Sequence, residues 1–207
     1  MESFNPHRDK IAVVLKEFTL KRKSDGLLDR FSEPYVVSMA IDENGAKSPA
    51  IDFNILPFPN VKKGDTVSFD GQGHLIYGPN NPGQFLAYSL LFMESDRDIR
   101  NFGQMVEDIL TSEAINGSAK VLLAATPTYS TALNVLQKIA ELTALQLQKN
   151  KDDELFRRNG TLLRDVIPSY DILRTYKSEN RFIQMQTSII PLKESNQIGV
   201  QTKRIYL

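Results

Sequence analysis

The sequence predicts a mainly β protein with inserted helices, folded as one antiparallel β-sandwich. Three observations support this fold class. Short apolar runs with the period of strands fill the first half of the chain, and turn-forming residues separate them. The period changes to that of amphipathic helices in the middle of the chain. A strand-like run then returns near the end, where it could complete the sandwich.

The expected strands of the first half are short, and each is bounded by residues that favour turns. They are 11–15 with its continuation 18–20, then 35–41, 51–55, the end of 61–69, and 85–93. The segment Asp42-Glu43-Asn44-Gly45 is expected to form a hairpin turn, because Asn-Gly supplies the positive φ angles that such turns require. The Pro- and Gly-containing segment 79–83 is expected to be a loop.

Two helices are expected between the strands. Apolar residues at three- and four-residue spacings predict an amphipathic helix within 102–110, and a second, longer helix over 130–148. The second helix carries apolar residues around much of its circumference, which indicates burial on more than one side. Either the sandwich or a partner subunit would supply the second contact. The short apolar run 121–125 fits a buried strand or a helical turn.

The rest of the chain is read as a linker, a strand and a tail. Charged residues make 149–154 a solvated linker, and alternating apolar and polar residues predict a strand over 182–190. Residues 197–207 form either a last strand or a loose tail. The whole chain, 1–207, is therefore expected to be one domain, with a helical insertion at about 98–150 and a C-terminal tail at about 193–207.

Composition limits the classes of function. The chain has 207 residues, a formal net charge of zero and no cysteine, which excludes disulfides, thiolate metal sites and cysteine nucleophiles. A neutral chain has no overall field to attract nucleic acid, so no nucleic-acid partner is expected. No apolar run is long enough to span a membrane and the start of the chain has no signal-peptide pattern, so a cytoplasmic location is expected.

Two acidic clusters are the most informative feature of the sequence. The first ends at Glu33 and includes Asp25 and Asp29, and the second follows an apolar strand; its members are Glu94, Asp96 and Asp98. If both strand ends meet at one rim of the sandwich, five or six carboxylates converge there. Calcium prefers such oxygen-rich pockets, so Ca²⁺ is the one cofactor that the sequence suggests, and none is required.

The segments around these clusters resemble C2 domains. Ser32-Glu33-Pro34-Tyr35-Val36-Val37 is similar to the Ser-Asp-Pro-Tyr-Val segment of that family, whose preceding loop carries an Asp that Asp25 or Asp29 could replace. Glu94-Ser95-Asp96-Arg97 is similar to the Asp-x-Asp pattern of the second calcium loop. The resemblance covers about the first half of the chain, and the strand expected over 182–190 could close the sandwich.

The resemblance implies a C2-like antiparallel β-sandwich, and together with the acidic clusters it suggests a set of calcium ligands: Asp25, Glu33, Glu94, Asp96 and Asp98. Of these, Asp98 comes earlier in the chain than the later acidic ligand of the family, which has no clear counterpart here. An anionic membrane surface is a further partner that the sequence suggests, because Lys21, Arg22 and Lys23 lie beside the first cluster and could attract anionic headgroups. The chain departs from the family pattern in having Glu where two Asp are usual. The long helix over 130–148 is also foreign to an ordinary C2 sandwich.

Each of these residues also has a purely structural interpretation. Acidic residues in loops are commonly solvated turn formers, and Asp96 and Asp98 could cap the following helix. The basic run at 21–23 could be a solvated strand end. His74, next to two glycines, is expected to be a loop residue. Glu94 and Asp96 could act as an acid and base pair in a hydrolase, but the chain has no phosphate loop and no nucleophile elbow, so it is expected not to be an enzyme.

Two functions follow from these observations. The first is a structural or assembly subunit, which would contact a protein partner or its own copies through the inserted helices and the C-terminal tail. The tail ends in Arg204-Ile205-Tyr206-Leu207, which could add a strand to the edge of a neighbouring sheet. The alternative is a calcium- or lipid-responsive binding module that uses the acidic loops.

Overall fold

The computed structural model describes residues 4–22, 32–95, 104, 108–109, 111–113, 117, 127–149, 151–195 and 202–206. The elements named in this part of the chain are ten strands, two α-helices and one 3-10 turn. In chain order they are β1 (Ile11–Leu20), β2 (Pro34–Asp42), α1 (Glu43–Lys47), β3 (Ala50–Pro57), β4 (Thr66–Ser68), β5 (His74–Asn80), β6 (Phe85–Glu94), α4 (Tyr129–Lys149), β7 (Asp153–Leu163), η2 (Ser169–Asp171), β8 (Thr175–Glu179), β9 (Ile183–Pro191) and β10 (Lys203–Tyr206).

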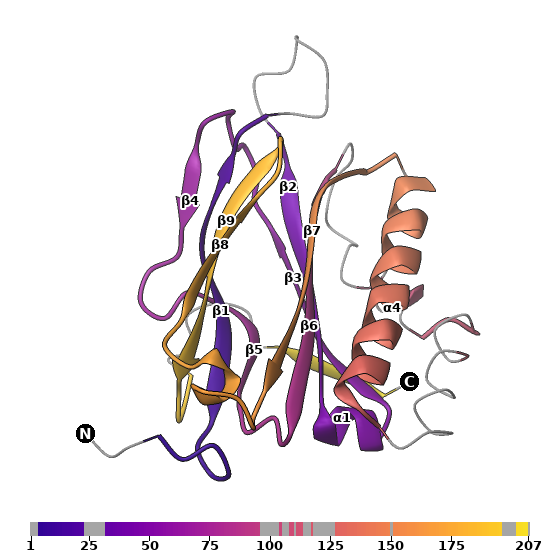
Figure 1. Ribbon diagram of the computed structural model, residues 1–207. Helices are drawn as coiled ribbons and strands as arrows, with labels where there is room; N and C mark the ends of the chain where they lie inside the picture. The colour runs from indigo at the N-terminus through magenta and orange to yellow at the C-terminus, as the bar shows by residue number, and fades with distance from the viewer. Residues whose placement is uncertain are drawn as a thin grey trace.

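The strands form two antiparallel sheets that face each other (Figure 1). One has the order β4-β1-β9-β8, with β5 also paired to β1, and the other has the order β10-β3-β2-β6-β7. Helix α4 lies on the outer face of the second sheet and connects its two neighbouring strands β6 and β7 (Figure 1). The expected β-sandwich with an inserted helix is confirmed.

The core between the sheets is built on alternate residues of the central strands. From β1 it takes the odd-numbered aliphatic residues near the strand's start, and from β6 the even-numbered residues. Aromatic rings join the two layers, with the ring centre of Phe18 lying 4.9 Å from that of Phe58 and 5.3 Å from that of Phe92. Edge-to-face ring pairs of this kind contribute roughly 0.5–1.5 kcal/mol beyond the area that they bury.

A second core lies between α4 and its sheet. The helix buries residues at three- and four-residue spacings against outward-facing side chains of β2 and β6. These helix residues are Ala132, Val135, Leu136, Ile139, Ala140, Thr143, Ala144 and Leu147. Burying one leucine at such a contact contributes roughly 1.5–3 kcal/mol. The helix that the sequence predicts over 130–148 is therefore present, and the sheet supplies one of its contacts.

The segment after β2 differs from the expected hairpin turn. Asp42 accepts a hydrogen bond from the backbone amide of Gly45 at 2.6 Å and so caps the short helix α1. Asp is a strong N-cap residue, and the first turn also carries the favourable acidic residue Glu43. The cap therefore starts a helical turn where the Asn-Gly pair alone suggested a hairpin.

Strands β5, β7 and β8 are absent from the sequence-based expectation. Strand β7 has polar residues in its middle and contains Gly160, which lies opposite Tyr88 of β6. A Cβ atom on Gly160 would come within 2.5 Å of the Tyr88 ring, so the ring occupies the space that a side chain would need. This glycine serves a cross-strand contact, although glycine in a sequence usually argues against a strand.

His74 is not a loop residue, contrary to the expectation. It begins β5 and is 2% exposed, and its ring centre lies 5.7 Å from that of Phe69. Neither ring nitrogen has a hydrogen-bond partner within the described residues. Burial lowers the pKa of His74 from its ordinary value of 6.5 to about 4, because the charged imidazolium would lose its hydration.

Acidification is predicted to destabilise the fold through His74. Between pH 6.5 and pH 4 the unfolded chain takes up a proton on this residue, whereas the folded chain does not. The free energy of unfolding should therefore fall over this range, by about 3 kcal/mol for this one group. Urea unfolding of the wild type and of His74→Gln across this pH range isolates the contribution of His74. The other titrating groups contribute equally to both proteins, so their effects cancel in the difference between the two free energies of unfolding.

The control for this prediction is His7→Gln, which changes the only other histidine of the chain, an exposed residue. This variant should follow the wild-type pH profile. A wild-type profile parallel to that of His74→Gln would contradict the assignment.

Candidate functional site

The two acidic corners meet at one rim of the sandwich in their described parts. Strand β2 begins where β6 ends, so that Pro34 lies opposite Glu94. One step further on, the backbone amide of Ser95 donates a hydrogen bond of 3.2 Å to the carbonyl oxygen of Glu33. Glu33 is half-buried and Glu94 is 3% exposed. Asp25, Asp29, Asp96, Asp98 and Lys23 lie outside the described residues.

A third acidic segment lies at the same rim. The sequence predicts a solvated linker for this segment, residues 149–154. Asp153, the first residue of β7, lies opposite Glu94. Its neighbour Asp152 is 3% exposed and accepts a hydrogen bond of 2.7 Å from the hydroxyl of Tyr35. Burial, and then the bond to Asp152, raise the pKa of Tyr35 above its usual range. The sequence offers only the acidic run itself as a signal, because the strand that follows it, β7, was not predicted.

Acidic side chains at this rim are paired with other residues of the same chain. Glu154 forms a bidentate ion pair with Arg157, at 3.1 and 2.6 Å. Within the described residues, no three Asp, Glu or His side chains are grouped to hold a metal ion. Of the basic residues predicted to contact lipid, Lys21 pairs with Glu179 at 3.2 Å and Arg22 is exposed.

The C-terminal strand is fixed in the chain's own sheet. Strand β10 pairs with β3, and Arg204 donates two hydrogen bonds to the carboxylate of Asp52, at 2.7 and 3.0 Å. The same guanidinium lies 3.5 Å from Asp42, which also accepts a bond of 2.9 Å from the Tyr77 hydroxyl. Burial raises the pKa of Asp52, although Arg204 opposes the shift. These contacts connect β10, β3, β2 and β5 through one polar network.

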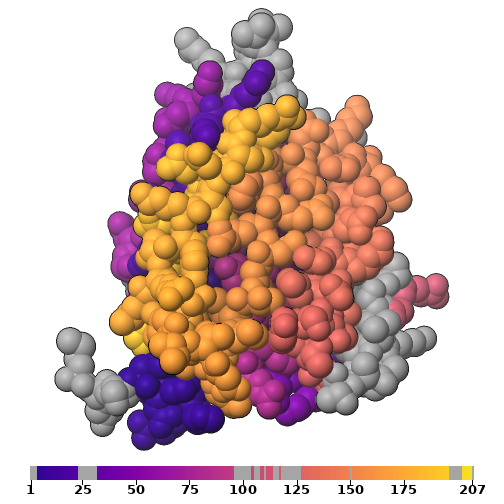
Figure 2. Space-filling model, viewed as in Figure 1, coloured from indigo at the N-terminus to yellow at the C-terminus, as the bar shows by residue number. Residues whose placement is uncertain are grey.

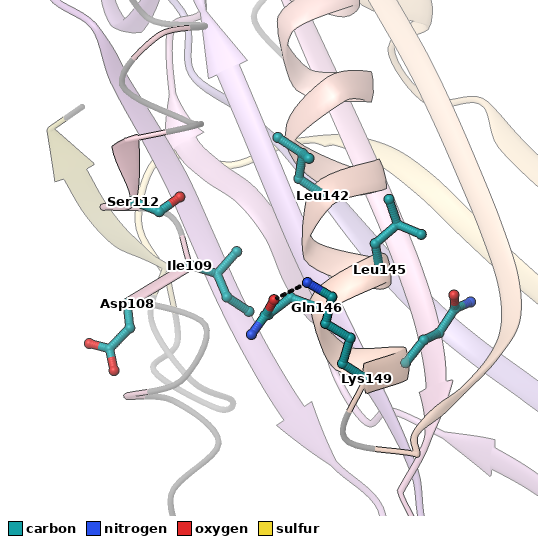
Figure 3. Close-up of a pocket in the computed structure, with 8 residues that line it drawn as sticks. Asp108, Ile109, Ser112, Leu142, Leu145, Gln146 and Lys149 are labelled. Atoms are coloured by element: carbon teal, nitrogen blue, oxygen red, sulfur yellow. Dashed lines mark hydrogen bonds between the residues drawn. The ribbon is translucent and has the colours of Figure 1, made fainter.

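A groove lies beside α4 in the described structure. It has a volume of about 870 Å³ and runs between the C-terminal half of α4 and the segment that contains Ile109 (Figure 3). Its lining residues, which define the "α4 groove" below, are Asp108, Ile109, Ser112, Leu142, Leu145, Gln146, Gln148 and Lys149. Leu145 is 49% exposed, whereas Ile109 belongs to the core beneath the helix.

The α4 groove explains the second apolar side of the helix that the sequence analysis noted. Leu136 and Ile139 face the sheet, whereas Leu145 points into solvent. The groove forms between two segments that are distant in sequence, 108–112 and 142–149. The sequence could therefore predict the helix but not the concave surface. Its polar rim residues Asp108 and Lys149 are exposed and carry opposite charges.

Comparisons with protein-family models, with curated proteins and with solved structures gave no match. Within the described part of the chain, no helix has the length and apolar character needed to cross a membrane.

Replacing Tyr35 by Phe is predicted to destabilise the rim. The change removes a hydrogen bond from a fully buried hydroxyl to the buried Asp152, and bonds to charged acceptors contribute about 1.5–3 kcal/mol. Urea unfolding at pH 7 measures this loss. Tyr206→Phe is the matched control, because Tyr206 is 72% exposed. Equal, small losses in both variants would show that the Tyr35–Asp152 bond has no stabilising role.

Proposed function

We propose that this chain is a non-enzymatic assembly subunit, built on a C2-like sandwich, that binds a protein partner through the α4 groove. The cytoplasmic location expected from the sequence is part of this proposal. The observation that carries it is the exposure of apolar surface on a helix whose opposite face is already packed. Contiguous exposed apolar surface beside a polar rim is typical of protein-binding sites.

The packing of α4 supports this proposal. Eight of its residues are buried, yet Tyr129 and Leu145 are 48% and 49% exposed and Leu142 is only half-buried. A helix that served only to cover the sheet would carry polar residues at the outward positions. Leu145 and Leu142 lie instead beside a groove large enough to receive several side chains.

The C-terminal tail has a narrower part in this proposal than the sequence suggested. Residues 203–206 occupy an edge of their own sheet, so they are not free to extend a neighbour's sheet without leaving β3. The outer edge of β10, next to the exposed Tyr206, is the part of the tail that can contact a partner.

The experiment that tests the proposal changes one groove residue. Leu145→Asp places a charge in the groove and should reduce partner binding at least about tenfold, because the carboxylate would lose its water on binding. Gln137→Asp introduces the same charge on an exposed part of α4 outside the groove and should bind as the wild type does. Immobilised protein, exposed to an extract of the source cells, measures retention of any protein, including further copies of this chain.

The expected result is a protein retained by the wild type and by Gln137→Asp but lost from Leu145→Asp. If retention is the same for all three proteins, or if nothing is retained, the groove is not a protein-binding site.

A calcium- or lipid-responsive module is the second candidate, and the meeting of the acidic corners supports it. Glu33 and Glu94 lie at neighbouring strand ends, and Asp152 and Asp153 of a third segment lie beside them. Clustered carboxylates repel one another, and a divalent ion would relieve that repulsion. An anionic membrane would then be the partner. Of the predicted lipid-binding residues, Lys21 and Arg22 lie in the described part of the chain, and Arg22 is the exposed one.

Calcium is predicted to stabilise the fold if this second function holds. Calcium at a hundred times the dissociation constant of the site would add about 2.7 kcal/mol to the free energy of unfolding. Thermal unfolding with and without millimolar calcium measures the shift. Asp96→Asn should abolish it, whereas Asp70→Asn, an exposed acidic residue next to β4, should not. The absence of any shift in the wild type would exclude the calcium module.

A further inference from the structure

Basic side chains from three separate segments gather at one end of the β4-β1-β9-β8 sheet. Because β1 runs antiparallel to both of its neighbours, its end lies beside the starts of β4 and β9. Lys21 and Arg22 follow β1, Lys62 and Lys63 lie before β4, and Arg181 precedes β9. Lys21 is half-buried and the other four are exposed. These five residues are called the "basic ridge" below.

Backbone hydrogen bonds hold the three segments of the basic ridge together. The amide of Lys21 donates to the carbonyl oxygen of Phe182 at 2.6 Å, and the amide of Gly64 donates to that of Leu20 at 2.7 Å. The amide of Leu20 donates in turn to the carbonyl oxygen of Asp65 at 3.1 Å. Figures 1 and 2 show these strand ends together at the upper end of the molecule. The basic ridge is therefore fixed by the sheet itself.

The basic ridge carries an excess of positive charge in a chain whose formal net charge is zero. Its three segments, 20–22, 61–65 and 179–182, contain five basic residues and two acidic ones, so three positive charges are in excess there. One of the acidic residues, Glu179, pairs with Lys21 at 3.2 Å. The other, Asp65, accepts a hydrogen bond of 2.9 Å from the backbone amide of Lys62. A local excess of this kind attracts anionic groups, although the chain as a whole has no such field.

Three members of the basic ridge are available to a partner. Arg22, Lys63 and Arg181 are exposed and form no ion pair within the described residues. The guanidinium carbon of Arg181 lies 4.5 Å from the centre of the Phe182 ring. Stacking of this kind uses the flat face of a guanidinium, whereas its N–H groups lie in its plane and can donate in pairs to a carboxylate. The basic ridge therefore offers donors to anionic groups, and its surroundings decide which anionic partner fits.

Acidic residues beside the basic ridge disfavour a broad anionic partner such as a membrane. The ridge adjoins the acidic rim where Ser32 and Val61 pair in an isolated bridge, since Glu33 follows the first and Lys62 follows the second. The exposed Asp153 lies further along the same rim. A flat anionic surface over this end of the sandwich would cover the rim as well, and like charges repel within a Debye length of roughly 8–10 Å. A narrow acidic segment can lie on the basic ridge alone.

The spacing of the strands sets the length of such a segment. The three strand ends belong to neighbours in the order β4-β1-β9. Neighbouring strands lie about 4.8 Å apart, so the basic ridge extends over roughly 10 Å from its first segment to its last. An extended peptide advances about 3.3 Å per residue, so about four residues cross the ridge.

We propose that the basic ridge binds a short acidic segment of another protein, in which about four consecutive residues are mostly Asp and Glu. The carboxylates of this segment pair with Arg22, Lys63 and Arg181. The basic ridge and the α4 groove share no residue, so this inference goes beyond the proposed function and stands without it. Because exposed ion pairs are individually weak and screened by salt, the binding is modest in affinity and falls with ionic strength.

Binding of a fluorescein-labelled oligoglutamate, measured by fluorescence anisotropy in buffer with EDTA, tests this inference. The double variant Arg22→Gln/Lys63→Gln should weaken the binding about three- to tenfold at low salt, because two exposed ion pairs are lost. Both side chains are exposed, so the fold should stay intact, which thermal unfolding verifies.

The matched control is the double variant Lys10→Gln/Lys193→Gln. It removes the same amount of charge from exposed residues at the opposite end of the sheet, just before β1 and just after β9. That end lies roughly 30 Å from the basic ridge along β1, beyond the Debye length, so this variant should bind the peptide as the wild type does. An oligoglutamine of the same length should not bind to any of the three proteins.

Three results would overturn the inference. The wild type could fail to bind oligoglutamate, or the two double variants could lose affinity equally, which would leave the basic ridge without a specific role. Vesicles of equal parts phosphatidylserine and phosphatidylcholine could bind the wild type more tightly than the peptide does, with the binding lost in Arg22→Gln/Lys63→Gln. In that case the partner of the ridge would be a membrane and not an acidic segment.

Discussion

The burial of β2 and β6 on both faces is the constraint on which the rest of the structure depends. Every residue of these two strands is buried, from Pro34 to Asp42 and from Phe85 to Glu94. One face needs the opposite sheet, and the other needs α4, because exposed apolar strands at the centre of a sheet would be unstable in water. The helix is thus a structural requirement of the sandwich. Only its outward side is available for another task, and there the α4 groove lies.

The sequence alone predicted the helices and strands in segments where one hydrophobic period dominates. It failed in segments whose secondary structure depends on tertiary contacts. Apolar runs located β2, β6 and β9, and the long helical period located α4 to within a residue at each end. Strand β7 was missed because its central residues, from Arg157 to Gly160, are polar or small and are accommodated only by their neighbours across the sheet. Strand β5 was missed because glycines and prolines flank or interrupt it, and α1 because the Asp42 cap outweighed the turn preference of Asn-Gly.

The candidate sites show the same division. The two acidic clusters could be recognised from their spacing and from the strands that precede them, and their described members, Glu33 and Glu94, lie at neighbouring strand ends. Asp152 could not be assigned to that rim, because its place depends on the turn between α4 and β7 and on the Tyr35 hydroxyl. The exposure of Ile167 was equally hidden, since exposed Ile167 and core Ile189 are the same residue type in the sequence.

The contact between Tyr88 and Gly160 has a consequence for how this protein can diverge. A methyl group at position 160 would come within 2.5 Å of the Tyr88 ring, so a side chain there requires this ring to move or a smaller residue at position 88. The two positions are 72 residues apart in the sequence but are coupled through this one contact. An exchange at one of these positions is therefore expected to accompany an exchange at the other, which offers a means of recognising remote relatives of this fold.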